Sequence, residues 1–199
     1  MSHTVPADQT AAELSAWWRL IELCLPLHDT CGALTFRPSG AETIGSDWDE
    51  WLVGVYFPVL SPAFEQLLAA ACAQDLQAVR AADTDLGKSL APACARSSLG
   101  VGRRVLSDCL PPQGAKLLEN LRLWAEQDTT AGHAATVFAV RGQVFHLPGV
   151  QLAAAFLLAE CVLGAEAAGV TLPAARAAEL VRGGLAGSRR DAAVQLMAV

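Results

Sequence analysis

The sequence predicts an all-α protein: a single-domain bundle of about nine or ten helices. Alanine, the strongest helix former, supplies 38 of the 199 residues, whereas Val, Ile and Thr together supply 28. Apolar residues recur at helical spacing along the chain, and no convincing alternating strand interrupts them. We therefore expect one helical domain over residues 1–199, long enough to bury a substantial core.

The first helix is expected to be amphipathic. Thr10 and Glu13 form a capping box, and the helix ends before Pro26. Its apolar stripe consists of Leu14, Trp17, Trp18, Ile21 and Leu25. We expect residues 1–9 to be disordered and residues 27–45 to form a long loop, because this segment holds three glycines, a proline and scattered polar residues. Loops of that length inside a domain are usually functional or disordered.

Caps and prolines divide the middle of the chain into short helices. Ser61 is expected to cap one of them, with Pro62 at its first helical position. Asp75 is expected to cap the next. The predicted helix starts in this region lie at or after Ser46, Ser61, Asp75, Pro92 and Pro112.

The last third of the chain holds the most apolar segment. A helical stripe within residues 130–145 begins near His133, and residues 149–169 are then apolar on nearly all sides. Such a helix must be central or lie at an interface. Another helix is expected from Pro173 to the pair Gly183–Gly184, and a short one from Ser188 within a C-terminal tail of residues 187–199.

Composition narrows the function. The net charge is −6 with no basic patch, which argues against nucleic-acid binding. The longest uncharged run, residues 142–159, is shorter than the roughly 20 apolar residues of a membrane span. No secretory signal is present and the six cysteines are dispersed, so we expect a cytoplasmic protein with reduced thiols. Only 17% of residues are charged, which predicts apolar surface covered by a partner.

The search for catalytic motifs is negative. The sequence contains no G-x-x-x-x-G-K-[ST], G-x-S-x-G, H-E-x-x-H or C-x-x-C motif. We therefore predict that the chain is not an enzyme and binds no resident cofactor. A helical enzyme with a cysteine nucleophile is an alternative that only the number of cysteines near His28 suggests.

One cluster has the chemistry of a metal site. Cys24, His28 and Cys31 are spaced C-x3-H-x2-C across the end of the first helix and the loop. Thiolate and imidazole are donors that bind nickel, zinc or copper. The other interpretation, which we place first, is that Cys24 continues the buried face, Cys31 is incidental and His28 is solvated.

Several residues are candidates for a partner interface. Trp17 and Trp18 are adjacent and cannot point the same way, so one of them can face a partner, although both have core spacing. The densest basic spot holds Arg96, Arg103 and Arg104, which are solvated charges unless a partner supplies carboxylates. His133 opens a helical run and is equally well read as a cap or a core histidine.

The order of segments resembles the UreF family of urease accessory proteins. In FPVLSPAFEQLLAAACAQDLQAV, a Pro-x-Phe helix start leads to an aspartate cap, and the matching positions are Pro62, Phe64, Leu67, Ala70 and Asp75. LGVGRRVLSD is similar to the family's Gly-Arg-Arg-Leu-Leu helix, and HAATVFAVRGQVFHLP, the helix around Phe156 and AAGVTLP follow in the family's order. The resemblance covers roughly residues 15–185.

This resemblance implies an all-helical homodimer without catalytic activity. Such a protein binds a UreD/UreH-like accessory protein and a UreG-like GTPase and helps deliver nickel to apo-urease, with nickel passing as transient cargo. The chain departs from the family at the glycine-rich loop, at a basic position occupied by Thr171 and in a shortened tail. Since these departures touch partner contacts, the alternative is a diverged paralogue that serves another metalloenzyme or binds metal itself.

Overall fold

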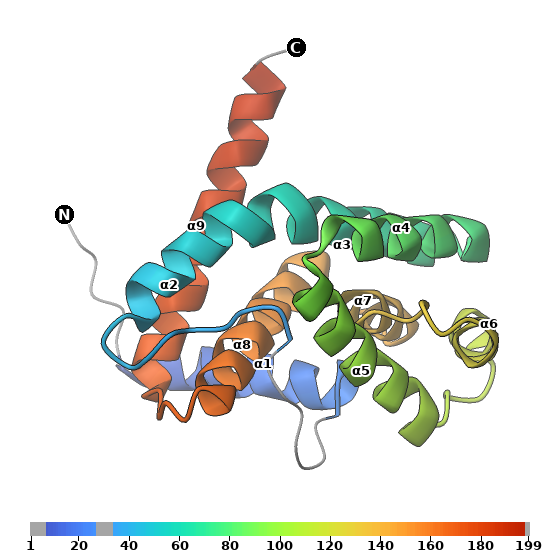
Figure 1. Ribbon diagram of the computed structural model, residues 1–199, viewed down its shortest axis with the longest axis horizontal. Coiled ribbons are helices and arrows are strands. Elements are labelled where there is room, and N and C mark those ends of the chain that lie inside the picture. Colours follow the sequence, from blue (N-terminus) through green and yellow to red (C-terminus); the bar gives the residue numbers. More distant parts are fainter. Residues whose placement is uncertain (1–6, 27–33, 198–199) are drawn as a thin grey trace.

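The computed structural model describes the backbone of residues 7–26 and 34–197, and the side chains of residues 10–26 and 34–187. Every regular element within these residues is a helix, which confirms the all-α prediction (Figure 1). Residues 1–6 of the segment expected to be disordered lie outside this part of the chain, and Ala7 already begins the first helix. The helices are α1 (Ala7–Cys24), α2 (Ile44–Trp51), η1 (Leu52–Leu60), α3 (Ser61–Cys72), α4 (Leu76–Ser89), α5 (Pro92–Asp108), α6 (Lys116–Gln127), α7 (Ala134–Val144), α8 (Gly149–Ala167) and α9 (Ala174–Met197).

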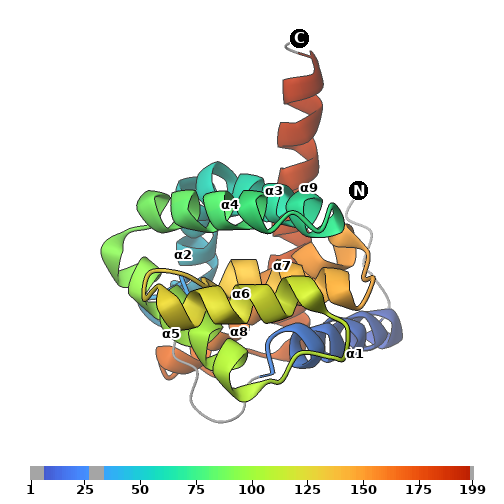
Figure 2. The ribbon, with the colours of Figure 1, turned by 90° about the vertical axis from the view of Figure 1, so that its right-hand side faces the viewer.

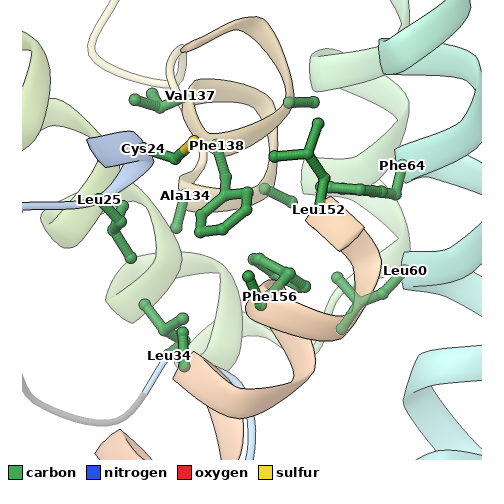
Figure 3. Close-up of a cluster of buried hydrophobic side chains, with 14 of the residues drawn as sticks. Cys24, Leu25, Leu34, Leu60, Phe64, Ala134, Val137, Phe138, Leu152 and Phe156 are labelled. Atoms are coloured by element: carbon green, nitrogen blue, oxygen red, sulfur yellow. The ribbon is translucent and has the colours of Figure 1, made fainter. Parts of the chain in front are cut away.

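The core is built around α7 and α8. α7 contacts α1, α3, α5, α6 and α8, and its residues from Ala134 to Gly142 are all buried. The rings of Phe64, Phe138 and Phe156 meet where α3, α7 and α8 come together, with centroids 5.4 to 6.2 Å apart (Figure 3). The apolar sequence of α8 predicted a helix that is either central or at an interface, and the structure shows that α8 is central.

α2, η1 and α3 form one continuous helical rod from Ile44 to Cys72, so the expected break at Ser61 is wrong. Ser61 has helical torsion angles, φ −62° and ψ −49°, and makes no side-chain cap. The nine residues of η1 are wound as a π-helix and include Pro58. The wider π turn relieves the clash between a proline ring and the preceding turn, so the helix continues where an α-helix would kink.

The first predicted cap is also wrong, because α1 begins before it. Thr10 and Glu13 bind Arg182 of α9 instead. The Arg182 guanidinium donates to Glu13 Oε2 at 2.6 and 3.1 Å and to Thr10 Oγ1 at 3.0 Å. These two residues thus join the first helix to the last.

α9 continues through the pair Gly183–Gly184 to Met197, so the separate last helix and short tail predicted from Ser188 are not formed. A Cβ at position 184 would lie 3.2 Å from Leu52 and 3.3 Å from Leu157. The glycine therefore serves close packing of α9 on its neighbours and does not end the helix. Beyond this contact the end of α9 projects from the body of the molecule (Figures 1 and 2).

Two helical stretches, Ile44–Cys72 and Gly149–Ala167, are long and apolar enough to cross a membrane by length and composition. The second is α8, which is mostly buried as a core helix. In the first stretch, only 28% of the most apolar 18 residues are buried, so the rod has apolar residues on its surface. The expected absence of a membrane span stays a prediction.

Candidate functional site

Cys24, the first of the predicted metal ligands, lies at the end of α1 with its side chain in the core. It is fully buried, beside Val137 and Phe138 in Figure 3. Burial raises the pKa of the Cys24 thiol to about 12, against the opposing effect of Arg141. The thiolate is the form that binds metal, so this environment favours the buried-face interpretation of Cys24.

His28 and Cys31 lie outside the described residues. Within residues 10–26 and 34–187, no three or more His, Cys, Asp and Glu side chains are placed to hold a metal ion together. What the structure defines is how the two ends of the segment 27–33 are held.

Arg141 of α7 holds the end before this segment. Its Nε and Nη2 donate to the Leu23 carbonyl oxygen at 3.2 and 2.9 Å, and the residue is only 7% exposed. A cation at the C-terminal end of α1 satisfies a carbonyl that the helix leaves unpaired and complements the helix dipole. Arg141 Nη1 is buried and has no hydrogen-bond partner among the described residues.

Residues 34–37 follow this segment, and we call them the strap. Glu160 of α8 holds the strap in place. Its Oε2 accepts the Thr35 N–H at 2.8 Å and the Phe36 N–H at 2.9 Å, and its Oε1 accepts the Thr35 hydroxyl at 2.9 Å. Burial raises the pKa of Glu160 to about 7, although these hydrogen bonds and Arg37 act in the opposite direction. One buried carboxyl group thus fixes the strap across α8.

Other contacts place the strap among three helices. Trp51 Nε1 of α2 donates to Thr35 Oγ1 at 3.1 Å, and Cys94 Sγ of α5 donates to the Thr35 carbonyl at 3.6 Å. A Cβ at Gly164 of α8 would lie 2.7 Å from the Phe36 carbonyl oxygen, so only glycine allows this approach. The segment 27–33 is therefore bounded on both sides by backbone that buried charged side chains anchor.

Sequence reasoning missed Arg141 and Glu160 as functional residues. Glu160 was visible as one of two acids in an otherwise apolar helix, and an acid on the buried side of such a helix needs buried partners. The partners of both residues lie more than 100 residues away, those of Glu160 in a loop of irregular sequence and that of Arg141 at the end of α1, and no local pattern identifies them.

Arg103, predicted as a partner contact, closes the end of α6. Its Nη1 donates to the carbonyl oxygens of Ala125 and Asp128, the second at 2.7 Å. The preceding Gly102 is equally structural, because a Cβ there would lie 2.1 Å from the Gly132 carbonyl oxygen. Arg96 and Arg104 are exposed. Of the basic candidates, Arg103 thus has a defined internal role.

His133 is buried, 1% exposed, at the start of α7. Burial lowers the pKa of its imidazole, while the nearby Asp83 acts in the opposite direction. Asp83 of α4 caps α7 from outside that helix: its carboxylate accepts the N–H groups of Gly132 and His133, both at 2.9 Å, and the Thr136 hydroxyl. The structure thus assigns His133 to the interior, not to a partner surface.

The remaining candidates, Trp17, Trp18 and Thr171, lie in α1 and in the connection between α8 and α9. Trp17 is half-buried, whereas Trp18 is 39% exposed beside an apolar hollow of about 500 Å³ between α1, α8 and α9. Thr171 is exposed and lines a cleft of about 800 Å³ between α2 and α9. Leu172 lines both the hollow and the cleft. Trp18 and Thr171 therefore lie on either side of one ridge, which Leu172 forms.

The fold and these contacts define an all-helical protein in which the backbone on both sides of residues 27–33 is held by buried side chains. No known protein family, curated protein or solved structure matches the chain. The class of the protein therefore rests on its own residues.

Proposed function

We propose that the chain is a non-catalytic scaffold for metal insertion, a divergent UreF-like protein that acts as a homodimer in the cytoplasm. Its partners would be a UreG-like GTPase, a UreD/UreH-like protein and apo-urease, with nickel as transient cargo. The observation that supports the proposal is that positions resembling the UreF family form helix caps and contacts between helices in this fold. Asp75 caps α4 by accepting the N–H groups of Gln77 and Ala78 at 2.9 and 3.0 Å, and Gly102 and Arg103 fit α5 against α6 and α7.

The anchored segment 27–33 supports a role in handling metal. Arg141 and Glu160 fix the backbone on either side of it, so ligands between them would be presented from a defined place. The ridge bordered by Trp18 and Thr171 offers a face for partners. A scaffold needs both features and no catalytic group of its own.

Co-purification tests this function. The chain is expected to associate with a UreG-like GTPase and a UreD-like protein in the presence of GTP or GDP, and to raise the activity of apo-urease supplied with nickel. Failure of the three proteins to associate with either nucleotide would contradict the proposal. Thr171→Glu adds an acid to the cleft that Glu179 also lines and is expected to weaken association, whereas Lys88→Glu on α4 serves as a control.

The second candidate is a diverged paralogue that binds metal itself, which the C-x3-H-x2-C spacing favours. Titration with Ni²⁺ and Zn²⁺ compares the wild type with the variant Cys24→Ser/His28→Ala/Cys31→Ser. The control variant, Cys72→Ser/His146→Ala/Cys109→Ser, changes the same residue types elsewhere. Equal binding by all three proteins would eliminate the site.

A cysteine-dependent enzyme receives no support from the two buried cysteines. Burial raises the pKa of both Cys24 and Cys161 to about 12, so both are protonated at neutral pH. A nucleophilic cysteine needs thiolate character. Alkylation kinetics would check the other four cysteines, Cys31, Cys72, Cys94 and Cys109, and uniformly slow labelling would exclude this alternative.

A further inference from the structure

The outer face of α1 is open and carries few charges. Its exposed residues in the described part of the helix are Ala11, Ala12, Ser15, Ala16, Trp18, Arg19 and Glu22. α1 lies at an edge of the molecule (Figures 1 and 2). Small side chains allow another helix to approach closely, and an exposed tryptophan is typical of the centre of an interface.

A hollow lies next to this face. It holds about 500 Å³ and is lined mainly by apolar side chains, with Leu14 and Trp18 on one wall and Leu158, Val162 and Leu172 around them. Arg19 and Glu22 stand at its rim. The hollow is large enough for an indole ring, and Trp18 presents such a ring beside it.

The two rim charges are self-complementary. Arg19 and Glu22 are one helical turn apart, and neither forms a hydrogen bond or an ion pair with any residue in the described part of the chain. A twofold axis crossing α1 between Leu20 and Ile21 lays two copies of the helix antiparallel, as a symmetric interface requires. Arg19 of each copy then lies opposite Glu22 of the other, and each Trp18 lies beside the end of the other copy's hollow that Glu22 lines.

We propose that the outer face of α1 is the surface through which two copies of this chain pair, each inserting Trp18 into the hollow of the other. This inference rests on the homodimer of the proposed function and names its interface. A second copy is the occupant that the charges favour, because it already carries the complementary pair. A surface of one charge sign would satisfy only Arg19 or only Glu22.

A charge-exchange experiment tests this pairing. Arg19→Glu and Glu22→Arg each turn two attractive contacts into two repulsive ones, so each variant alone is expected to dimerise at least tenfold more weakly by analytical ultracentrifugation. Mixed in equal amounts, the two variants regain both attractive pairs and are expected to form a heterodimer with nearly wild-type affinity. Since only folded chains can be rescued in this way, the mixture separates a lost contact from lost folding.

Two further variants complete the test. Trp18→Ala is expected to weaken the dimer at least tenfold, whereas Lys88→Glu, which reverses one charge of an exposed pair on α4, leaves it unchanged. A wild-type dimer that survives Arg19→Glu, or single variants that do not rescue each other, would overturn the α1 interface while leaving a homodimer through another face. A wild-type chain that stays monomeric would overturn both the interface and the homodimer.

Discussion

Asp83 and Glu160 are two buried carboxyl groups with the same kinds of donor. Each accepts two backbone N–H groups and one threonine hydroxyl. At Asp83 each oxygen faces a backbone N–H, whereas at Glu160 both backbone N–H groups lie on Oε2 and Oε1 faces only a hydroxyl. A backbone N–H can only donate, but a hydroxyl can also accept. Glu160 can therefore carry a proton on Oε1 and keep its contacts with the strap, because Oε1 faces no backbone N–H.

The surroundings of the two carboxyl groups also differ in how well they stabilise a negative charge. Asp83 lies at the N-terminal end of α7, where the helix dipole and unpaired N–H groups favour a negative charge. Glu160 faces the strap, which is not a helix end, and burial raises its pKa to about 7. The comparison teaches that two buried carboxyl groups with the same number of donors can divide them differently, and that only the division at Glu160 leaves one oxygen without a backbone N–H.

The largest effect is expected from Asp83→Ala. The substitution leaves two buried N–H groups and a hydroxyl without their acceptor, which costs about 3 kcal/mol or more of the free energy of unfolding. Urea unfolding at pH 7 measures this loss. Asp85→Ala, which removes an exposed acid from the same helix, is the control and should change stability by less than about 0.5 kcal/mol. A loss below about 1 kcal/mol for Asp83→Ala would contradict the proposed capping of α7.

Whether the sequence predicted a contact depends on how far apart its two partners lie in the chain. Asp75 was predicted as a cap because its partners, Gln77 and Ala78, follow it directly, and the structure confirms the cap. Asp83 sits 49 residues from Gly132 in an amphipathic helix, where its sequence looks like that of a solvated acid. The end of α9 shows the reverse error, since a glycine pair is typical of a helix end but Gly184 serves packing. Local chemistry is thus readable from sequence, and contacts between helices are not.

The second prediction concerns pH and Glu160. Because the folded pKa is raised from the ordinary 4.5 to about 7, the folded state binds more protons than the unfolded state between these values. The contribution of Glu160 is therefore fully present below about pH 4.5 and is lost as pH rises through 7, by about 3 kcal/mol in total. Urea unfolding measured from pH 4.5 to 8.5 follows this change.

Glu160→Gln isolates that contribution. Its amide oxygen can take the place of Oε2 and accept both backbone N–H groups, while its NH₂ donates to the Thr35 hydroxyl oxygen. The variant should match the wild type at pH 5 and be more stable by about 2–3 kcal/mol at pH 8, where the wild type buries a charge. Parallel pH profiles for the two proteins would show that Glu160 does not titrate in this range.

Asp83→Asn is expected to act in the opposite direction and with a smaller magnitude. Whichever way the amide is turned, its NH₂ faces a backbone N–H of Gly132 or His133, so one acceptor is lost. We expect a loss of about 1–2 kcal/mol at pH 8, where Glu160→Gln gains stability. If both substitutions raised, or both lowered, the free energy of unfolding at pH 8, the proposed difference between the two carboxyl groups would be contradicted.

The smallest effect tests whether burial is what makes Asp83 costly to replace. Arg103 also closes a helix end by reaching from another helix, but it is half-exposed, so water can take over the carbonyl oxygens of Ala125 and Asp128 once the guanidinium is removed. Arg103→Met should therefore lower the free energy of unfolding by only about 1 kcal/mol, against a negligible change for the exposed Arg96→Met. Urea unfolding of the two variants measures the difference. A loss for Arg103→Met as large as that for Asp83→Ala would mean that the carbonyl oxygens stay dry without the guanidinium, and that burial of the helix end matters more than burial of the side chain that caps it.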